Sequence, residues 1–302
     1  MPCVRISPMN ERQRIPFLIA SSVAADFPPP HRFSLQKTIE IAKGRADGTQ
    51  LYVNPERFVP EDIDHDDVGK LRDMLAKGGL VVNVVHLPGY AIPKDLKGKS
   101  RQAMSIASGL VDPIPDVGKL CVIHHDPFST VSDSETVDTT SRVLDALGDS
   151  EIAIGLEHFH PFNQTTQANL AEQVDRYIEL LGKMREQVPT FAVFDIGRFY
   201  TPDNANIPPA PLTDNDNQLV EKMCAAVAGQ RVLVHAIDKK SMDRSFREQG
   251  NAVPLGTGVL TPIYRQMFLT GEKHHIQWIG VVNEIETVGA ISNKEAIQEL
   301  LI

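Results

Sequence analysis

Histidine and carboxylate side chains stand at the ends of short apolar runs along this sequence. In VLVHAID three apolar residues lead into His235 and Asp238 follows three positions later, and GLEH carries Glu157. Other residues in such places are His86, His124, Asp195, Glu284 and Glu286. Imidazole nitrogens and carboxylate oxygens are ligands that suit Mn²⁺, Mg²⁺, Co²⁺ or Zn²⁺. These residue types therefore predict a divalent-metal site, provided that the fold brings the ends of the runs together.

The apolar runs have the length and composition of buried parallel strands. Most are rich in valine and isoleucine and nearly continuously apolar, as strands covered on both faces should be. They span residues 15–21, 49–53, 80–86, 119–125, 152–158, 190–196, 231–237 and 276–286. Segments with helical spacing lie between them, such as 170–187 and 217–229. In the first of these, an apolar stripe runs through Leu170, Val174, Ile178 and Leu181.

Eight strand–helix units without a break in composition predict an α/β fold, a single (β/α)8 TIM barrel over residues 1–302. The functional residues of such a barrel lie at the C-terminal ends of its strands. An open doubly wound sheet is the main alternative, but it usually carries a glycine-rich turn after its first strand. Here the first run continues into SSVAADFPPPHRF, which has no such turn.

The first apolar run has a second interpretation. The stretch RQRIPFLIASSVAAD resembles a signal peptide, because basic residues precede a short apolar segment and small residues follow it. We prefer a first strand at 15–21, since a closed barrel needs one there.

Net charge and cysteine content limit the kinds of partner and the cellular compartment that we expect. Lysine and arginine total 30 against 39 aspartates and glutamates, which gives a formal net charge of −9. An acidic surface repels phosphate backbones, so we expect no nucleic-acid partner. Cys3, Cys121 and Cys224 are odd in number and lack CxxC spacing, which predicts free thiols in a reducing, cytoplasmic setting. No apolar run has the length of a membrane span, so no membrane partner is expected.

The motifs at the run ends resemble those of the xylose isomerase-like TIM barrels, which include sugar-phosphate isomerases, ketose 3-epimerases, inosose dehydratases and endonuclease IV. The resemblance is strongest after residue 150, where His235 and Asp238 match H-x-x-D and GTG at 256–258 matches a later G-x-G turn. It implies four metal ligands, namely Glu157, Asp195, His235 and Glu284. Glu286 remains an alternative ligand, because it shares a strand face with Glu284 by period two.

Two motifs depart from that pattern. Many relatives carry D-x-x-H after strand six, whereas Asp195 is followed here by Arg198. Endonuclease IV-like members place a D-x-H pair before the glycine turn, and the segment REQGNAVPLGTG lacks one. A trinuclear zinc cluster would therefore lack ligands, and together with the net charge this favours sugar chemistry over DNA repair.

The resemblance implies a divalent-metal-dependent isomerase or epimerase that acts on a sugar, sugar phosphate or related polyol through an enediolate. Glu157 and Glu284 would move the proton while also touching the metal. Residues expected to contact the substrate, or in the case of Asp238 to orient an imidazole, are His86, His124, His160, Arg198 and Asp238. Each has a plainer alternative as a structural, capping or solvated side chain.

Two other functions stay open. An inosose-dehydratase-like lyase could use the same metal and the same proton abstraction to eliminate water. A catalytically silent metal-binding barrel is the other alternative. The resemblance also allows a homo-oligomer, since relatives often form dimers or tetramers.

Overall fold

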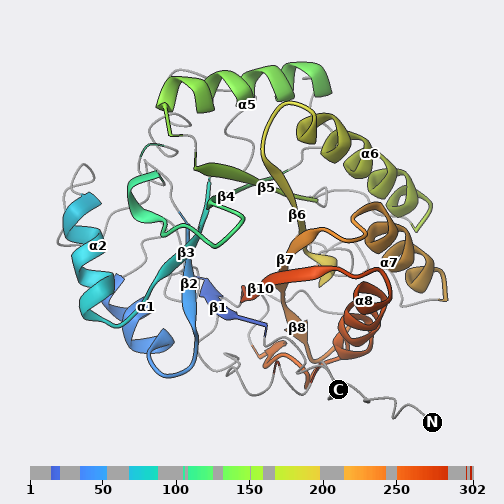
Figure 1. The fold of residues 1–302 in the computed structure, drawn as a ribbon. Coiled ribbons are helices and arrows are strands. Elements are labelled where there is room, and N and C mark those ends of the chain that lie inside the picture. Colours follow the sequence, from blue (N-terminus) through green and yellow to red (C-terminus); the bar gives the residue numbers. More distant parts are fainter. Residues whose placement is uncertain are drawn as a thin grey trace, which may run out of the picture.

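Eight parallel strands close into a barrel in the computed structural model (Figure 1), which describes residues 15–20, 35–52, 68–87, 105, 108–124, 132–149, 151–158, 167–197, 214–242, 250–284, 297 and 300. The barrel order is β1-β10-β7-β6-β5-β4-β3-β2. These strands are β1 (Phe17–Ala20), β2 (Gly48–Tyr52), β3 (Val82–His86), β4 (Lys119–His124), β5 (Ile152–Glu157), β6 (Thr190–Phe194), β7 (Arg231–Ala236) and β10 (Gln277–Asn283). Every predicted run is a barrel strand, so the predicted (β/α)8 fold is confirmed, and the first run serves as β1.

Helices surround the barrel on its outside (Figure 1). They are α1 (Leu35–Ala42), α2 (Val68–Lys77), α5 (Asp133–Leu147), α6 (Gln167–Arg185), α7 (Asp214–Ala226) and α8 (Thr261–Lys273). Helices α6 and α7 each begin three residues before their predicted start, because their first turns, QAN and DND, are mostly polar and carry no apolar periodicity. On α6, Val174 and Leu181 are buried and Ile178 is partly buried, as the stripe predicts; the side chain of Leu170 lies outside the described residues.

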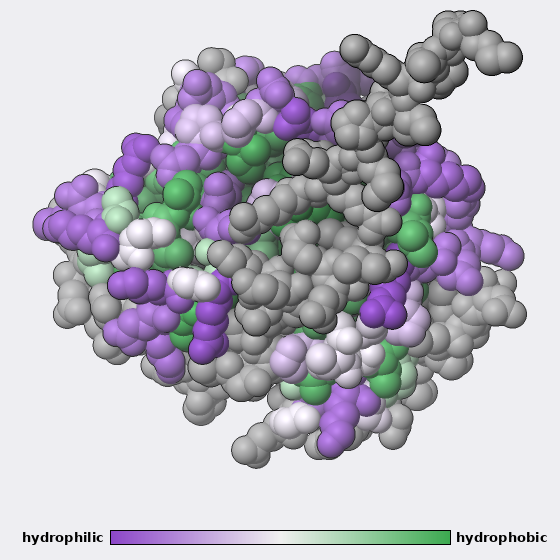
Figure 2. Space-filling model, turned by 60° about the horizontal axis from the view of Figure 1, so that its bottom comes forward, coloured by the Kyte–Doolittle hydropathy of each residue, from purple (hydrophilic) through white to green (hydrophobic). Residues whose placement is uncertain are grey.

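Two hydrophobic clusters fill the described part of the molecule. The larger lies between the strands and the helices, and the smaller fills the barrel with Leu18, Val84, Val122, Val193 and Leu233 among its members. Figure 2 shows hydrophilic side chains over much of the described outer surface of one face. Among the described helices, none is long and apolar enough to cross a membrane. Cys121 and Cys224 are buried free thiols, as predicted; Cys3 lies outside the described residues.

Strand period two places polar side chains above the apolar filling of the barrel. Val84, Val122 and Leu233 belong to the inner cluster, so the residues two positions later on the same strands face the same way. Those residues are His86, His124 and His235. The C-terminal ends of parallel strands meet at one end of a barrel, and the polar ring therefore forms at its mouth.

A two-stranded antiparallel hairpin, β8 (Asp238–Lys239) with β9 (Ala252–Val253), follows β7. The sequence analysis did not predict it, because strands of two residues are too short to show periodicity. It holds Asp238, whose buried carboxylate accepts hydrogen bonds from the backbone N–H of Lys239, Gly256, Gly258 and Leu260 and from the Thr261 hydroxyl, at 2.9–3.2 Å.

These bonds explain the G-x-G motif. Gly256 has a φ of +86°, which favours glycine, and a Cβ on Gly258 would collide with the Asp238 carboxylate. The glycine-containing loop leads directly into α8. On this helix, the Tyr264 hydroxyl accepts a hydrogen bond from the Ile237 N–H and donates one to the Ile237 carbonyl, both at 3.0 Å. Asp238 and Tyr264 thus fix the chain immediately after His235.

We predict that Asp238→Ala destabilises the barrel by about 3–5 kcal/mol. The change leaves several buried N–H donors without their charged acceptor, and each such loss costs about 1–3 kcal/mol without strict additivity. Urea unfolding measures the free energy of unfolding. Lys240→Ala is the matched control, since Lys240 is the next exposed side chain in the same hairpin region and should change stability by no more than about 0.5 kcal/mol. Equal stability of the two variants would contradict this role.

Candidate metal centre

Four side chains from four neighbouring strands converge at the mouth of the barrel. Glu157 ends β5, Asp195 directly follows β6, His235 lies on β7, and Glu284 directly follows β10. Each offers one ligand atom, and these atoms lie within 4.8 Å of one another. Glu157, Asp195 and His235 are buried, and the Glu284 side chain is 11% exposed. The structure therefore brings together the four residues that the sequence resemblance implied as ligands.

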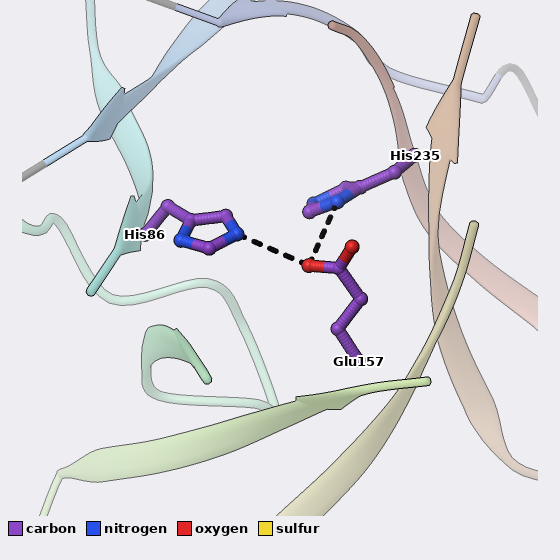
Figure 3. A group of neighbouring side chains, drawn as sticks. All are labelled: His86, Glu157 and His235. Carbon is purple, nitrogen blue, oxygen red and sulfur yellow. Dashed lines mark hydrogen bonds and ion pairs between the residues drawn. The ribbon is translucent and has the colours of Figure 1, made fainter. Parts of the chain in front are cut away.

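Three imidazoles also meet at one oxygen of Glu157. Nε2 of His86 lies 3.1 Å from Glu157 Oε2, Nε2 of His124 lies 3.2 Å from it, and Nδ1 of His235 lies 3.2 Å from it. Figure 3 shows the rings of His86 and His235 turned toward this oxygen. His86, Glu157 and His235 form a second group whose ligand atoms lie within 4.8 Å of one another. Glu157 is therefore the residue that both groups share.

Charge shifts the proton affinities of this cluster. Burial alone would raise the pKa of Glu157, but the charges of the nearby imidazoles of His124 and His235 hold it well below its usual value. Burial would lower the pKa of His235, yet the negative charges of Glu284 and Glu157 raise it to about 9. Glu157 is therefore a carboxylate at neutral pH, and the buried mouth attracts positive charge.

The sequence analysis missed Gln50, which belongs to the cluster, and His158, which contacts the Asp195 backbone from outside it. Gln50 on β2 lies between His235 and Glu284, with its Oε1 2.9 Å from His235 Nε2 and its Nε2 2.7 Å from Glu284 Oε1. His158, next to Glu157 and on the opposite face of the strand, accepts the backbone N–H of Asp195 through Nε2 at 2.8 Å. The available signal was positional: both are polar residues within otherwise apolar runs.

The structure places some of the other predicted site residues in the cluster and others elsewhere. His86 and His124 lie in the cluster, as described above. Among the described residues, the hydrogen bonds of the Asp238 carboxylate go to the segment 239–261 and none goes to an imidazole. His160, Arg198 and Glu286 lie outside the described residues, so their roles stay predictions.

The donor set fits a divalent cation. Three carboxylates and one imidazole supply oxygen and nitrogen ligands of the kind that Mn²⁺, Mg²⁺, Co²⁺ and Zn²⁺ accept. Nδ1 of His235 is buried, and within the described residues it makes no hydrogen bond. It nevertheless lies 3.2 Å from Glu157 Oε2 and 3.3 Å from Glu284 Oε1, off the direction that a hydrogen bond would require. A nitrogen so placed between two carboxylates suits a shared cation.

Comparison with solved structures defines the fold class. A xylose isomerase-like TIM barrel protein from Mycobacterium smegmatis in complex with magnesium is 13% identical, covers 95% of each chain and superimposes with a TM-score of 0.58. L-ribulose 3-epimerase is 14% identical over 95% of this chain and 86% of that one, with a TM-score of 0.52. D-allulose 3-epimerase from Methylomonas sp. in complex with D-allulose is 14% identical over 90% and 86%, with a TM-score of 0.53.

The protein therefore has the xylose isomerase-like TIM-barrel fold, which the sequence motifs had implied. Sequence comparison matches no protein-family model and no curated protein. The identities of 13–16% mean that the likeness lies in the fold, and sugar epimerases are among the proteins that share it.

We predict that divalent-metal affinity rises with pH from about 6.5 to 8.5. The pKa of His235 is about 9 in the metal-free protein, so over this range the ring must release a proton before Nδ1 can bind a cation. Loss of one proton corresponds to about tenfold tighter binding per pH unit. Calorimetric titration with Mn²⁺ in buffers of different ionisation enthalpy counts the protons released, with about one expected at pH 7. Affinity that stays constant over this range would contradict the assignment of His235 as a ligand.

Proposed function

We propose that this protein is a divalent-metal-dependent isomerase or epimerase that acts on a sugar, sugar phosphate or related polyol. The observation that carries the proposal is the convergence of Glu157, Asp195, His235 and Glu284 at the mouth of the barrel. Sugar epimerases among the proteins of the same fold support the substrate class. The reaction would move a proton at the carbon next to a carbonyl group and pass through an enediolate.

The four residues would share metal binding and proton transfer between them. Asp195 and His235 would hold the cation, which when bound would act as a Lewis acid on the substrate's carbonyl and hydroxyl oxygens. Glu157 and Glu284 would contact the cation and also take and return the substrate proton. Glu157 is ionised at neutral pH, which a proton acceptor must be. Its low pKa makes it a weak base, so it would act only on a C–H bond that is already acidified.

Histidines of the mouth supply the substrate contacts in this proposal. The His124 side chain is 16% exposed, more than those of His86 and His235, and so is better placed to meet a ligand from solvent. His86 donates from Nδ1 to the Leu87 carbonyl at 2.7 Å, which fixes the ring with Nε2 toward Glu157. His160 and Arg198 remain proposed substrate contacts on the sequence argument alone. For Asp238 the observed hydrogen bonds support a role in shaping the loop.

We predict that Glu157→Gln separates metal binding from proton transfer. The amide keeps an oxygen that can approach the cation, so metal affinity should fall without vanishing. It cannot accept a proton at neutral pH, so turnover and exchange of the substrate α-proton with deuterated solvent should fall by about 10²- to 10⁴-fold. The substrates to screen are keto-sugars and inososes, with metal content measured in the same preparation.

Glu151→Gln is the matched control, because Glu151 lies on the same chain segment at the opposite end of β5 and is 61% exposed. It should keep metal content and turnover. Full exchange and turnover in Glu157→Gln would move the proton transfer to Glu284. A product lighter than the substrate by one water would indicate an inosose-dehydratase-like lyase, and tight metal binding without turnover of any substrate would indicate a silent barrel.

A further inference from the structure

Gln50 lies inside the barrel although no chemistry was predicted for it. It is 2% exposed, and its register partners are Ala20 on β1 and Val84 on β3. Both partners belong to the cluster that fills the barrel, so the Gln50 side chain points into it as well. A buried amide needs partners for both of its ends, and Gln50 finds them in two of the candidate metal ligands.

The direction of these two bonds follows from the chemistry of the groups. A carboxylate oxygen accepts hydrogen bonds, so the end of Gln50 that lies 2.7 Å from Glu284 Oε1 is the NH₂ group, which donates to it. The other end is then the carbonyl oxygen, which can only accept. His235 Nε2, 2.9 Å from that oxygen, must therefore be the donor.

This polarity decides which nitrogen of His235 can bind a cation. With the proton held on Nε2 by Gln50, the lone pair of the neutral ring lies on Nδ1. Nδ1 is the atom that lies 3.2 Å from Glu157 Oε2 and 3.3 Å from Glu284 Oε1. The same glutamine thus aims the ring of one ligand and the carboxylate of another at a common point.

The barrel leaves room for this bridge. Strand β1 lies between β2, which carries Gln50, and β10, which precedes Glu284. The β1 residue in register with Gln50 is Ala20, and its small side chain leaves space for the glutamine to reach across to Glu284. A longer side chain at this place would occupy the path between them.

We infer that Gln50 is a positioning residue of the metal centre, which holds His235 as the Nε2–H form and orients Glu284 by a single amide bridge. This inference rests on the proposed function in that it takes His235 and Glu284 to be ligands. Groups that orient a metal ligand typically contribute about 10- to 100-fold to metal affinity.

Two substitutions separate the halves of the bridge. Gln50→Met has a similar length but can neither accept from His235 nor donate to Glu284. Gln50→Glu can still accept from His235 Nε2–H but cannot donate to Glu284. Gln173→Met is the matched control, since it makes the same change at a buried glutamine on α6, outside the cluster.

The test combines two measurements on the full chain. Protein labelled with ¹⁵N-histidine gives the His235 Nε2–H resonance, assigned by its loss in His235→Gln, in metal-free and zinc-loaded samples. We expect a downfield signal protected from solvent exchange in the unmodified protein, in Gln50→Glu and in Gln173→Met, and loss of that protection in Gln50→Met. Zinc titration should show affinity about 10- to 100-fold weaker in Gln50→Met and unchanged in Gln173→Met.

A bare Nε2 on His235 in the unmodified protein would overturn the inference, and this holds even if Gln50→Met fails to fold. So would an unchanged His235 signal and unchanged zinc affinity in Gln50→Met. Absence of divalent-metal binding by the unmodified protein would instead remove the proposed function, while the resonance of His235 would still report on the bridge.

Discussion

The structure depends on how a group of like charges is neutralised in a buried space. Glu157, Asp195 and Glu284 lie close together at the barrel mouth, where burial weakens the screening that water would provide. Buried carboxylates persist as anions only when positive charge or hydrogen-bond donors face them. The imidazoles of the cluster meet part of this need, and the raised pKa of His235, about 9, shows how strongly the site attracts a positive charge. A divalent cation would neutralise the negative charge of these carboxylates more fully.

The closed barrel makes it possible to place these carboxylates and imidazoles so close together. Parallel strands closed into a ring bring residues that are far apart in the sequence to one end, and period two keeps the positions below them apolar. Val122, Val193 and Leu233 fill the barrel beneath His124, Asp195 and His235. The polar cluster therefore stands on a packed base. Asp238 and Tyr264 hold the chain just beyond His235, away from the cluster itself.

The strands and the main candidate ligands could be predicted because each shows a local pattern in the sequence. The runs are apolar and of strand length, and Glu157, Asp195 and His235 stand at their ends. The roles of Gln50 and His158 could not be predicted from local sequence, since Gln50 reaches across the barrel to His235 on β7 and His158 accepts from the Asp195 backbone after the neighbouring strand β6. Asp238 was expected to orient an imidazole, whereas its described hydrogen bonds go to a loop whose path the sequence does not reveal.

Anomalous diffraction from crystals soaked in Zn²⁺ would locate the cation without depending on turnover. We expect a peak among Glu157, Asp195, His235 and Glu284, with His235 bound through Nδ1 and metal–ligand distances of about 2.0–2.2 Å. A mouth that stays free of metal at saturating Zn²⁺, or a cation bound by His235 through Nε2, would contradict this assignment of the ligands.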